Sequence, residues 1–168
     1  ASRRILGVAV PVVEQARELS RNQRLGVIGT RATIESKIYE KELAKLGNGF
    51  EVCEQACPLL VPLIEEGWVG KPECQMILKK YLRPLKIKKI DTLILACTHY
   101  PFLLKDIARI MGRNVKIINP AAAVAEKLKN YLARHPQIER KLGKNKKRVF
   151  YSTDSPAKFK SLGQKFLP

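Results

Sequence analysis

Short apolar runs rich in β-branched residues alternate along this chain with longer segments that carry their charges on one side. The clearest run, Thr92–Ala96, reads TLILA and is typical of a strand buried on both faces. Strands separated by helices favour a parallel arrangement, because each helical crossover returns the chain to the same end of the sheet. The sequence therefore predicts an α/β fold with a parallel sheet.

The other expected elements follow from the same periodicity and from Gly and Pro signals. The predicted strands are residues 5–10, 25–28, 50–53, 90–96, 115–118 and 148–152. The predicted helices are residues 12–19, 34–46, 61–66, 71–85, 103–111 and 121–134, and a last helix that begins with Asp154, Ser155 and Pro156. Residues 29–33 are expected to form a loop between a strand and a helix.

The composition indicates a globular chain with reduced thiols. Its 168 residues are 45% hydrophobic, enough for one domain or slightly more. No apolar run approaches the roughly 20 residues that span a membrane. The cysteines at positions 53, 57, 74 and 97 lack the paired spacing of a zinc site. Free thiols in the cytoplasm are therefore predicted, without a metal.

A large excess of basic residues gives the chain a net charge of +17, from 32 Lys and Arg against 15 Asp and Glu. Such an excess attracts nucleic acid, anionic membranes or acidic metabolites. The basic runs at residues 79–80, 86–89 and 144–148 lack the interleaved aromatic residues of a base-stacking surface. A solvated basic surface is favoured, and a nucleic-acid-binding module is the alternative.

Cys97 and His99 directly follow the central predicted strand, and Pro101 stands where a helix can begin. Ligands of open α/β sheets bind at the carboxyl ends of strands. A helix amino terminus and a nearby imidazole both favour a thiolate, which suits proton transfer or the nucleophile of a thiol hydrolase or transferase. A buried core cysteine with a hydrogen-bonded histidine fits the spacing equally well.

Thr30 and Thr33 occupy the predicted loop after residues 25–28. Hydroxyl and backbone N–H donors at a helix amino terminus suit a carboxylate ligand. Simple capping of the helix by either threonine is the alternative. The G-x-G-x-x-G spacing of a dinucleotide loop is absent, and no Walker lysine follows.

Four segments together carry a resemblance to a known family. They are RLGVIGTRATIESKIYE at 24–40, EQACPLLVPLIEEGW at 54–68, ACTHYPFLL at 96–104 and FYSTDSPAKFKSLGQKFL at 150–167. In this order and spacing they resemble the bacterial glutamate racemases of the aspartate/glutamate racemase superfamily. The resemblance extends over nearly the whole chain and implies a two-lobed, pseudo-symmetric α/β enzyme.

The resemblance implies cofactor-independent interconversion of L- and D-glutamate by a cysteine from each lobe. It assigns the role of one of these cysteines to Cys97. His99 would assist the proton transfer, and a histidine at this position indicates glutamate rather than aspartate as the substrate. The acid of a P-L-V-E-like segment falls on Glu65, with Glu66 as the alternative, and would orient or charge-couple to His99. The implied substrate contacts are Thr30, Thr33 and Thr98.

The resemblance also implies a cellular role. The enzyme would be a cytoplasmic isomerase that supplies D-glutamate for peptidoglycan, and so for cell wall biogenesis and cell shape. Its expected partner is the substrate glutamate, and pairing of two copies as a homodimer is allowed. No cofactor, nucleic acid or membrane is expected.

The sequence departs from the family in one respect. A D-S-G-x-G-G-like loop and a C-N-T segment with the first cysteine are expected but do not occur. The resemblance therefore implies a carboxy-terminal portion of the enzyme that is inactive alone. Residues 1–19 would be a remnant of the first lobe, residues 20–120 the complete second lobe, and residues 121–168 the return to the first.

Overall fold

The computed structural model describes residues 5–47, 49–145, 148–153 and 155–166. The chain divides into two compact units, Ala1–Tyr131 and Leu132–Pro168. The first unit contains α1 (Ala9–Leu19), β1 (Arg24–Gly29), α2 (Arg31–Glu35), α3 (Ile38–Lys45), β2 (Glu51–Ala56), α4 (Leu60–Glu65), α5 (Pro72–Ile87), β3 (Thr92–Ala96), the 3-10 helix η1 (Tyr100–Leu103), α6 (Leu104–Met111), β4 (Lys116–Ile118) and most of α7 (Pro120–Arg134). The second contains α8 (Pro136–Glu139) and α9 (Pro156–Phe166).

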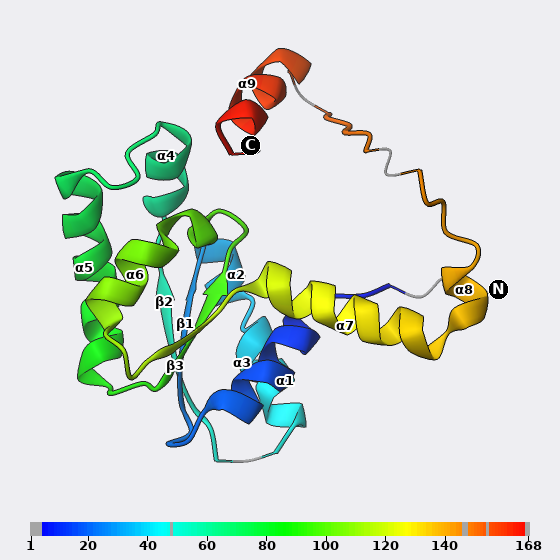
Figure 1. The fold of residues 1–168 in the computed structure, drawn as a ribbon. Helices are drawn as coiled ribbons and strands as arrows, with labels where there is room; N and C mark the ends of the chain where they lie inside the picture. The colour runs from blue at the N-terminus through cyan, green and yellow to red at the C-terminus, as the bar shows by residue number, and fades with distance from the viewer. Residues whose placement is uncertain (1–4, 48, 146–147, 154, 167–168) are drawn as a thin grey trace. The chain divides into compact units, whose positions relative to one another are not determined.

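The strands of the first unit form one parallel sheet in the order β2-β1-β3-β4 (Figure 1). Every residue of β3 is buried, as its apolar sequence predicts. Gly29 at the end of β1 pairs with both Ala56 and Ala96, so three strands end at the same level of the sheet. The predicted parallel α/β fold is confirmed.

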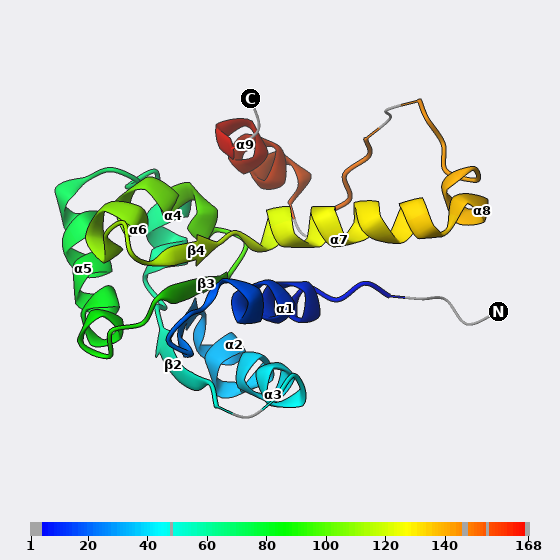
Figure 2. The ribbon, with the colours of Figure 1, turned by 60° about the horizontal axis from the view of Figure 1, so that its bottom comes forward.

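Helices cover both faces of this sheet, with α1 and α3 on one face and α5 and α6 on the other (Figures 1 and 2). On the first face, Val12 of α1 packs in a common core with Leu43 of α3 and Val27 of β1. On the second face, α5 buries side chains at helical spacing, namely Cys74, Leu78, Leu82 and Leu85. No helix within the described residues is long and apolar enough to span a membrane.

The structure confirms the predicted elements that correspond to β1–β4 and α4–α7, with shifted ends. Residues 5–10, however, do not form the predicted strand, because residues 5–7 are irregular and α1 already begins at Ala9. Pro11 is accommodated there because N–H groups in the first turn of a helix have no intrahelical partner. The apolar run then follows helical rather than strand periodicity and buries Val12, Val13 and Ala16.

The predicted helix at residues 34–46 is two helices, and the predicted loop at residues 29–33 is shorter. Thr30 alone separates β1 from α2. Lys37, between α2 and α3, has a φ of 57°, a left-handed conformation that interrupts a right-handed helix. Its Nζ donates a hydrogen bond of 2.7 Å to Glu54 Oε2 on β2. This long-range contact has no signature in the local sequence pattern.

Residues 148–152 do not form the predicted strand. A strand needs a neighbour to pair with its backbone groups, and no described residue provides one for this segment. The side chains of Val149, Phe150 and Tyr151 are exposed. The last helix is confirmed as α9, which begins at Pro156, whereas the predicted cap residue Asp154 lies outside the described residues.

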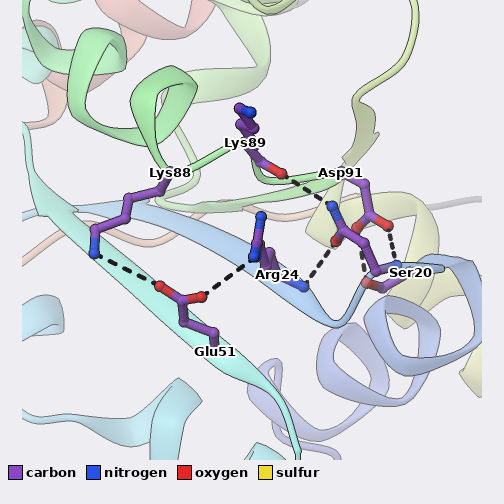
Figure 3. A network of polar contacts seen from close by, with 7 residues as sticks. Ser20, Arg24, Glu51, Lys88, Lys89 and Asp91 are labelled. Carbon is purple, nitrogen blue, oxygen red and sulfur yellow. Dashed lines mark hydrogen bonds and ion pairs between the residues drawn. The ribbon is translucent and has the colours of Figure 1, made fainter.

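Asp91 fixes the amino end of β3 (Figure 3). Its carboxylate accepts hydrogen bonds of 2.7 Å each from Ser20 Oγ and from the backbone N–H groups of Arg21 and Asn22. Burial opposes the charge, but these hydrogen bonds outweigh burial and lower the pKa of Asp91. Nearby ion pairs join Glu51 of β2 to Arg24 at 3.4 Å and to Lys88 at 3.7 Å. The amino edge of the sheet is therefore tied together by polar contacts.

Gly26 lies on β1 where the α5 side of the sheet packs closely. A Cβ atom at this position would meet Ile90 Cδ1 at 2.4 Å, so we expect Gly26→Ala to lower the free energy of unfolding by about 1–3 kcal/mol through overpacking. Urea denaturation measures this change. Gly7→Ala is the control, because its Cβ would have nothing within 4 Å; equal losses in both variants would contradict the packing argument.

Candidate active site

The loops that follow β1, β2 and β3 leave the sheet at one edge. Gly29, Ala56 and Ala96 stand in register at this edge. Thr30, Cys57 and Cys97 are the next residues, and Cys57 N–H bonds to the carbonyl of Gly29 at 2.8 Å. Parallel strands therefore bring three separate sequence segments to the edge where ligands of such sheets bind.

Cys97 is half-buried at the carboxyl end of β3. Burial raises the pKa of its thiol, although hydrogen bonds from the backbone of His99 and Tyr100 act in the opposite direction. The expectation that this position favours a thiolate is therefore wrong, because desolvation outweighs the backbone donors. A thiolate formed here would be a stronger base than one in water.

His99 lies between the Cys97 thiol and the Glu65 carboxylate. Its Nδ1 is 4.0 Å from Cys97 Sγ, and its Nε2 is 3.2 Å from Glu65 Oε1. A carboxylate accepts a hydrogen bond from Nε2–H. In a neutral imidazole with its proton on Nε2, Nδ1 is an acceptor, and here it faces the thiol. The neighbouring Glu66 is exposed. Of the two acids considered from the sequence, the structure thus brings Glu65 against His99.

The predicted substrate contacts lie at the same edge, with Thr30 between β1 and α2, Thr33 in α2 and Thr98 in the loop after β3. Thr30 caps α2, because its Oγ1 accepts a hydrogen bond of 3.4 Å from Thr33 N–H, and the two hydroxyl oxygens are 3.0 Å apart. The capping alternative is thus realised. Thr98 is exposed beside Cys97. Contact of these three hydroxyls with a substrate stays a prediction.

Tyr100 belongs to the site region but was not among the residues predicted from the sequence. Its side chain is fully buried, and its hydroxyl donates a hydrogen bond of 3.0 Å to the carbonyl of Cys57. This bond links the loop after β3 to the loop after β2. The available signal was a tyrosine within an apolar segment, since a buried phenol usually has a hydrogen-bond partner.

The described residues contain no cluster of three or more His, Cys, Asp or Glu side chains that could hold a metal ion. All four cysteines are free thiols. Cys57 and Cys74 are buried with 0% and 1% exposure, and Cys53 lies half-buried on β2. Cys97 is therefore the cysteine of this chain whose thiol faces an imidazole.

Cys57 makes the stability of the fold sensitive to alkaline pH. Burial raises the pKa of its thiol to about 12 from the ordinary 9.0. Above pH 9 the unfolded thiol loses its proton while the folded one keeps it, so the free energy of unfolding falls as pH rises toward 12, by up to about 1.4 kcal/mol per pH unit. Urea denaturation between pH 8 and 11 should give a shallower fall for Cys57→Ala than for Cys53→Ala, and equal slopes would contradict this assignment.

Comparison with known proteins adds an independent observation. A family model described as Asp/Glu/Hydantoin racemase matches residues 4–128. The chain belongs to this family. A glutamate racemase of Chlorobaculum parvum is 39% identical over 163 residues, which are 97% of this chain and 60% of that protein. One from a Sulfurihydrogenibium species is 39% identical over 94% of this chain and 58% of the relative.

Solved structures of family members agree with the fold. A crystal structure of the glutamate racemase isoform RacE1 from Bacillus anthracis matches 99% of this chain and 62% of its own, with a TM-score of 0.90 and 35% identity. A Francisella tularensis glutamate racemase in complex with D-glutamate matches 95% of this chain and 58% of its own, with a TM-score of 0.81 and 36% identity. The chain thus spans between about half and 60% of the length of the curated glutamate racemases that it resembles.

Proposed function

We propose that the whole protein interconverts L- and D-glutamate without a cofactor, and that Cys97 is one of its two proton-transfer groups. The observation that carries this proposal is the row of thiol, imidazole and carboxylate at the carboxyl edge of the sheet, with 4.0 Å from Cys97 to His99 and 3.2 Å from His99 to Glu65. Membership of the racemase family supports it. The substrate is proposed from the relatives, which are named glutamate racemases.

Inversion at Cα requires a base on one face of the carbon and an acid on the other. In the proposed reaction the Cys97 thiolate removes the α-proton of one enantiomer, and the opposing group returns a proton to the other face. In the reverse direction the Cys97 thiol donates its proton. His99 would take up or return the thiol proton through Nδ1 while Glu65 holds its Nε2 proton. Burial of Cys97 makes its thiolate a stronger base, and exclusion of water preserves that basicity.

The opposing group is not another thiol of this chain in the arrangement described. Cys57 and Cys74 are buried, so neither presents sulfur to a substrate. Cys53 lies within β2, whereas Ala56 is the residue at which this strand reaches the carboxyl edge of the sheet. We therefore propose that these 168 residues by themselves do not racemise glutamate. We also propose that residues 20–120 form the second lobe of the whole protein and that residues 1–19 and 121–168 belong to its first lobe.

The wider role follows from the same proposal. Thr30, Thr33 and Thr98 would hold a substrate carboxylate through their hydroxyls. D-glutamate produced in the cytoplasm would supply peptidoglycan, and hence the cell wall. Two copies of the whole protein could pair as a homodimer.

Solvent deuterium incorporation tests the proposal. The whole protein is incubated in D₂O with L- or D-glutamate, and deuterium at Cα and optical inversion are followed together. We expect both from the whole protein and neither from the 168-residue chain. A well-folded whole protein that gives no incorporation would contradict the racemase assignment, and inversion by the 168-residue chain would contradict the need for a second group from elsewhere.

A further inference from the structure

A groove between α5 and α6 gathers basic side chains away from the candidate active site. Its volume is about 670 Å³. The lining residues are Lys79, Arg83, Lys86 and Ile87 of α5 with Arg109 and Ile110 of α6. These residues extend from the middle to the carboxyl end of α5 and lie in the last turn of α6. Helices that connect parallel strands run opposite to the strands, so this groove lies toward the amino edge of the sheet, whereas Cys97 lies at the carboxyl edge.

The cations of α5 stand on one face of the helix. Lys79, Arg83 and Lys86 are spaced at i, i+4 and i+7, which places like charges next to one another and is unfavourable for an isolated helix. Within the described residues, Lys79 and Arg83 have no hydrogen-bond or ion-pair partner. Some lysines elsewhere on the chain pair with acids, such as Lys45 with Glu42 and Lys127 with Glu14.

The remaining two cations of the groove each have a partner. Lys86 Nζ donates a hydrogen bond of 2.7 Å to the carbonyl of Ile110, which joins α5 to α6. Arg109 Nη2 pairs with Asp106 Oδ1 at 2.8 Å, and the Asp106 side chain is only 14% exposed. Lys79 and Arg83 are therefore the cations of the groove without a side-chain partner among the described residues.

We infer that this groove binds a small molecule that carries two or more linked phosphate groups. Linked phosphates would neutralise the adjacent charges of Lys79 and Arg83, and the guanidinium can bind phosphate oxygens in a bidentate manner. A volume of about 670 Å³ is that of a small-molecule site. The six lining residues include no aromatic side chain on which a base could stack, which favours a compact oligophosphate over a nucleic-acid strand. Ile87 and Ile110 offer apolar contact to the rest of such a ligand.

Inorganic tripolyphosphate is the probe, and calorimetric titration of the 168-residue chain at 150 mM salt is the measurement. We expect saturable binding of one tripolyphosphate per chain and a higher melting temperature in its presence. The double variant Lys79→Gln/Arg83→Gln should bind about tenfold more weakly or worse, since it removes two charge-assisted contacts. Both side chains are exposed, so the variant should keep the circular dichroism spectrum of the parent.

The control is Arg140→Gln/Lys141→Gln, which removes the same two charges at exposed positions outside the groove. It should change affinity less than about twofold, because neither residue lines the groove and salt at this concentration screens charges that make no direct contact. Equal losses in the two double variants, or the absence of saturable binding, would overturn the inference in favour of diffuse charge attraction. A single-stranded oligonucleotide that competes at far lower phosphate concentration than tripolyphosphate, through the same residues, would also overturn it. None of these measurements depends on racemase activity.

Discussion

Replacing Cys97 by alanine in the whole protein is expected to lower the rate of glutamate inversion by about 10²–10⁴-fold in both directions. The variant lacks the group that removes the proton from one enantiomer and returns it to the other. Fold should be retained, because the half-buried thiol contributes little apolar area. The measurement is optical inversion of L- and D-glutamate together with deuterium incorporation at Cα.

Cys53→Ala is the matched control for this experiment. Cys53 is likewise half-buried but lies within β2, so its removal should leave inversion within about twofold of the parent while testing the general effect of losing a thiol. Deuterium can still enter one enantiomer of Cys97→Ala if the opposing group exchanges its own proton. Inversion that persists in Cys97→Ala at the parental rate would remove Cys97 from the reaction.

Glu65→Gln is expected to lower kcat by about 10²-fold, whereas Glu66→Gln should change it less than about twofold. Glu65 Oε1 faces His99 Nε2 at 3.2 Å, and Glu66 is exposed. A glutamine amide can donate a hydrogen bond to Nε2. Nε2 must then be unprotonated, so the proton of the neutral imidazole lies on Nδ1. The Nδ1–H would face the Cys97 thiol and could no longer accept its proton.

The pH profile separates this role from a structural one. Loss of packing alone would lower the rate equally at all pH values, but a changed imidazole tautomer should also alter the pH dependence of kcat while KM changes little. Steady-state kinetics of both variants between pH 6 and 10 measure the difference. Equal effects of Glu65→Gln and Glu66→Gln would mean that the contact between Glu65 and His99 has no part in catalysis.

Much of the fold can be predicted from the sequence because its strands have strong local signatures. The run Thr92–Ala96 has few polar atoms, and it forms the fully buried β3. Cys97 and His99 are two residues apart, so their proximity was also predictable. The acid at position 65 was selected by resemblance to a family motif, and the structure brings it to His99 although the two are 34 residues apart in sequence.

The errors arose where distant contacts or helix ends decide the local conformation. Residues 5–10 have strand composition, yet Ala9 and Val10 already belong to α1, and Ala9 packs against the core that α1 shares with β1 and α3. Lys37, where the predicted helix breaks, bonds to Glu54 on β2, a contact that lies 17 residues away in sequence. Residues 148–152 also have strand composition but lack a described neighbour to pair with. In each case the local sequence pattern could not specify which distant residues the segment would contact.

The hydrogen bond from Tyr100 to the carbonyl of Cys57 has a mechanical consequence. It fastens the segment that carries Cys97 and His99 to the segment that leads into α4, at whose end Glu65 lies. The thiol and imidazole on one segment and the carboxylate on the other are thus carried by two segments that are bonded to each other. If the whole protein opens to admit glutamate and closes around it, these three groups would travel together, and their alignment would not need to be rebuilt at each turnover.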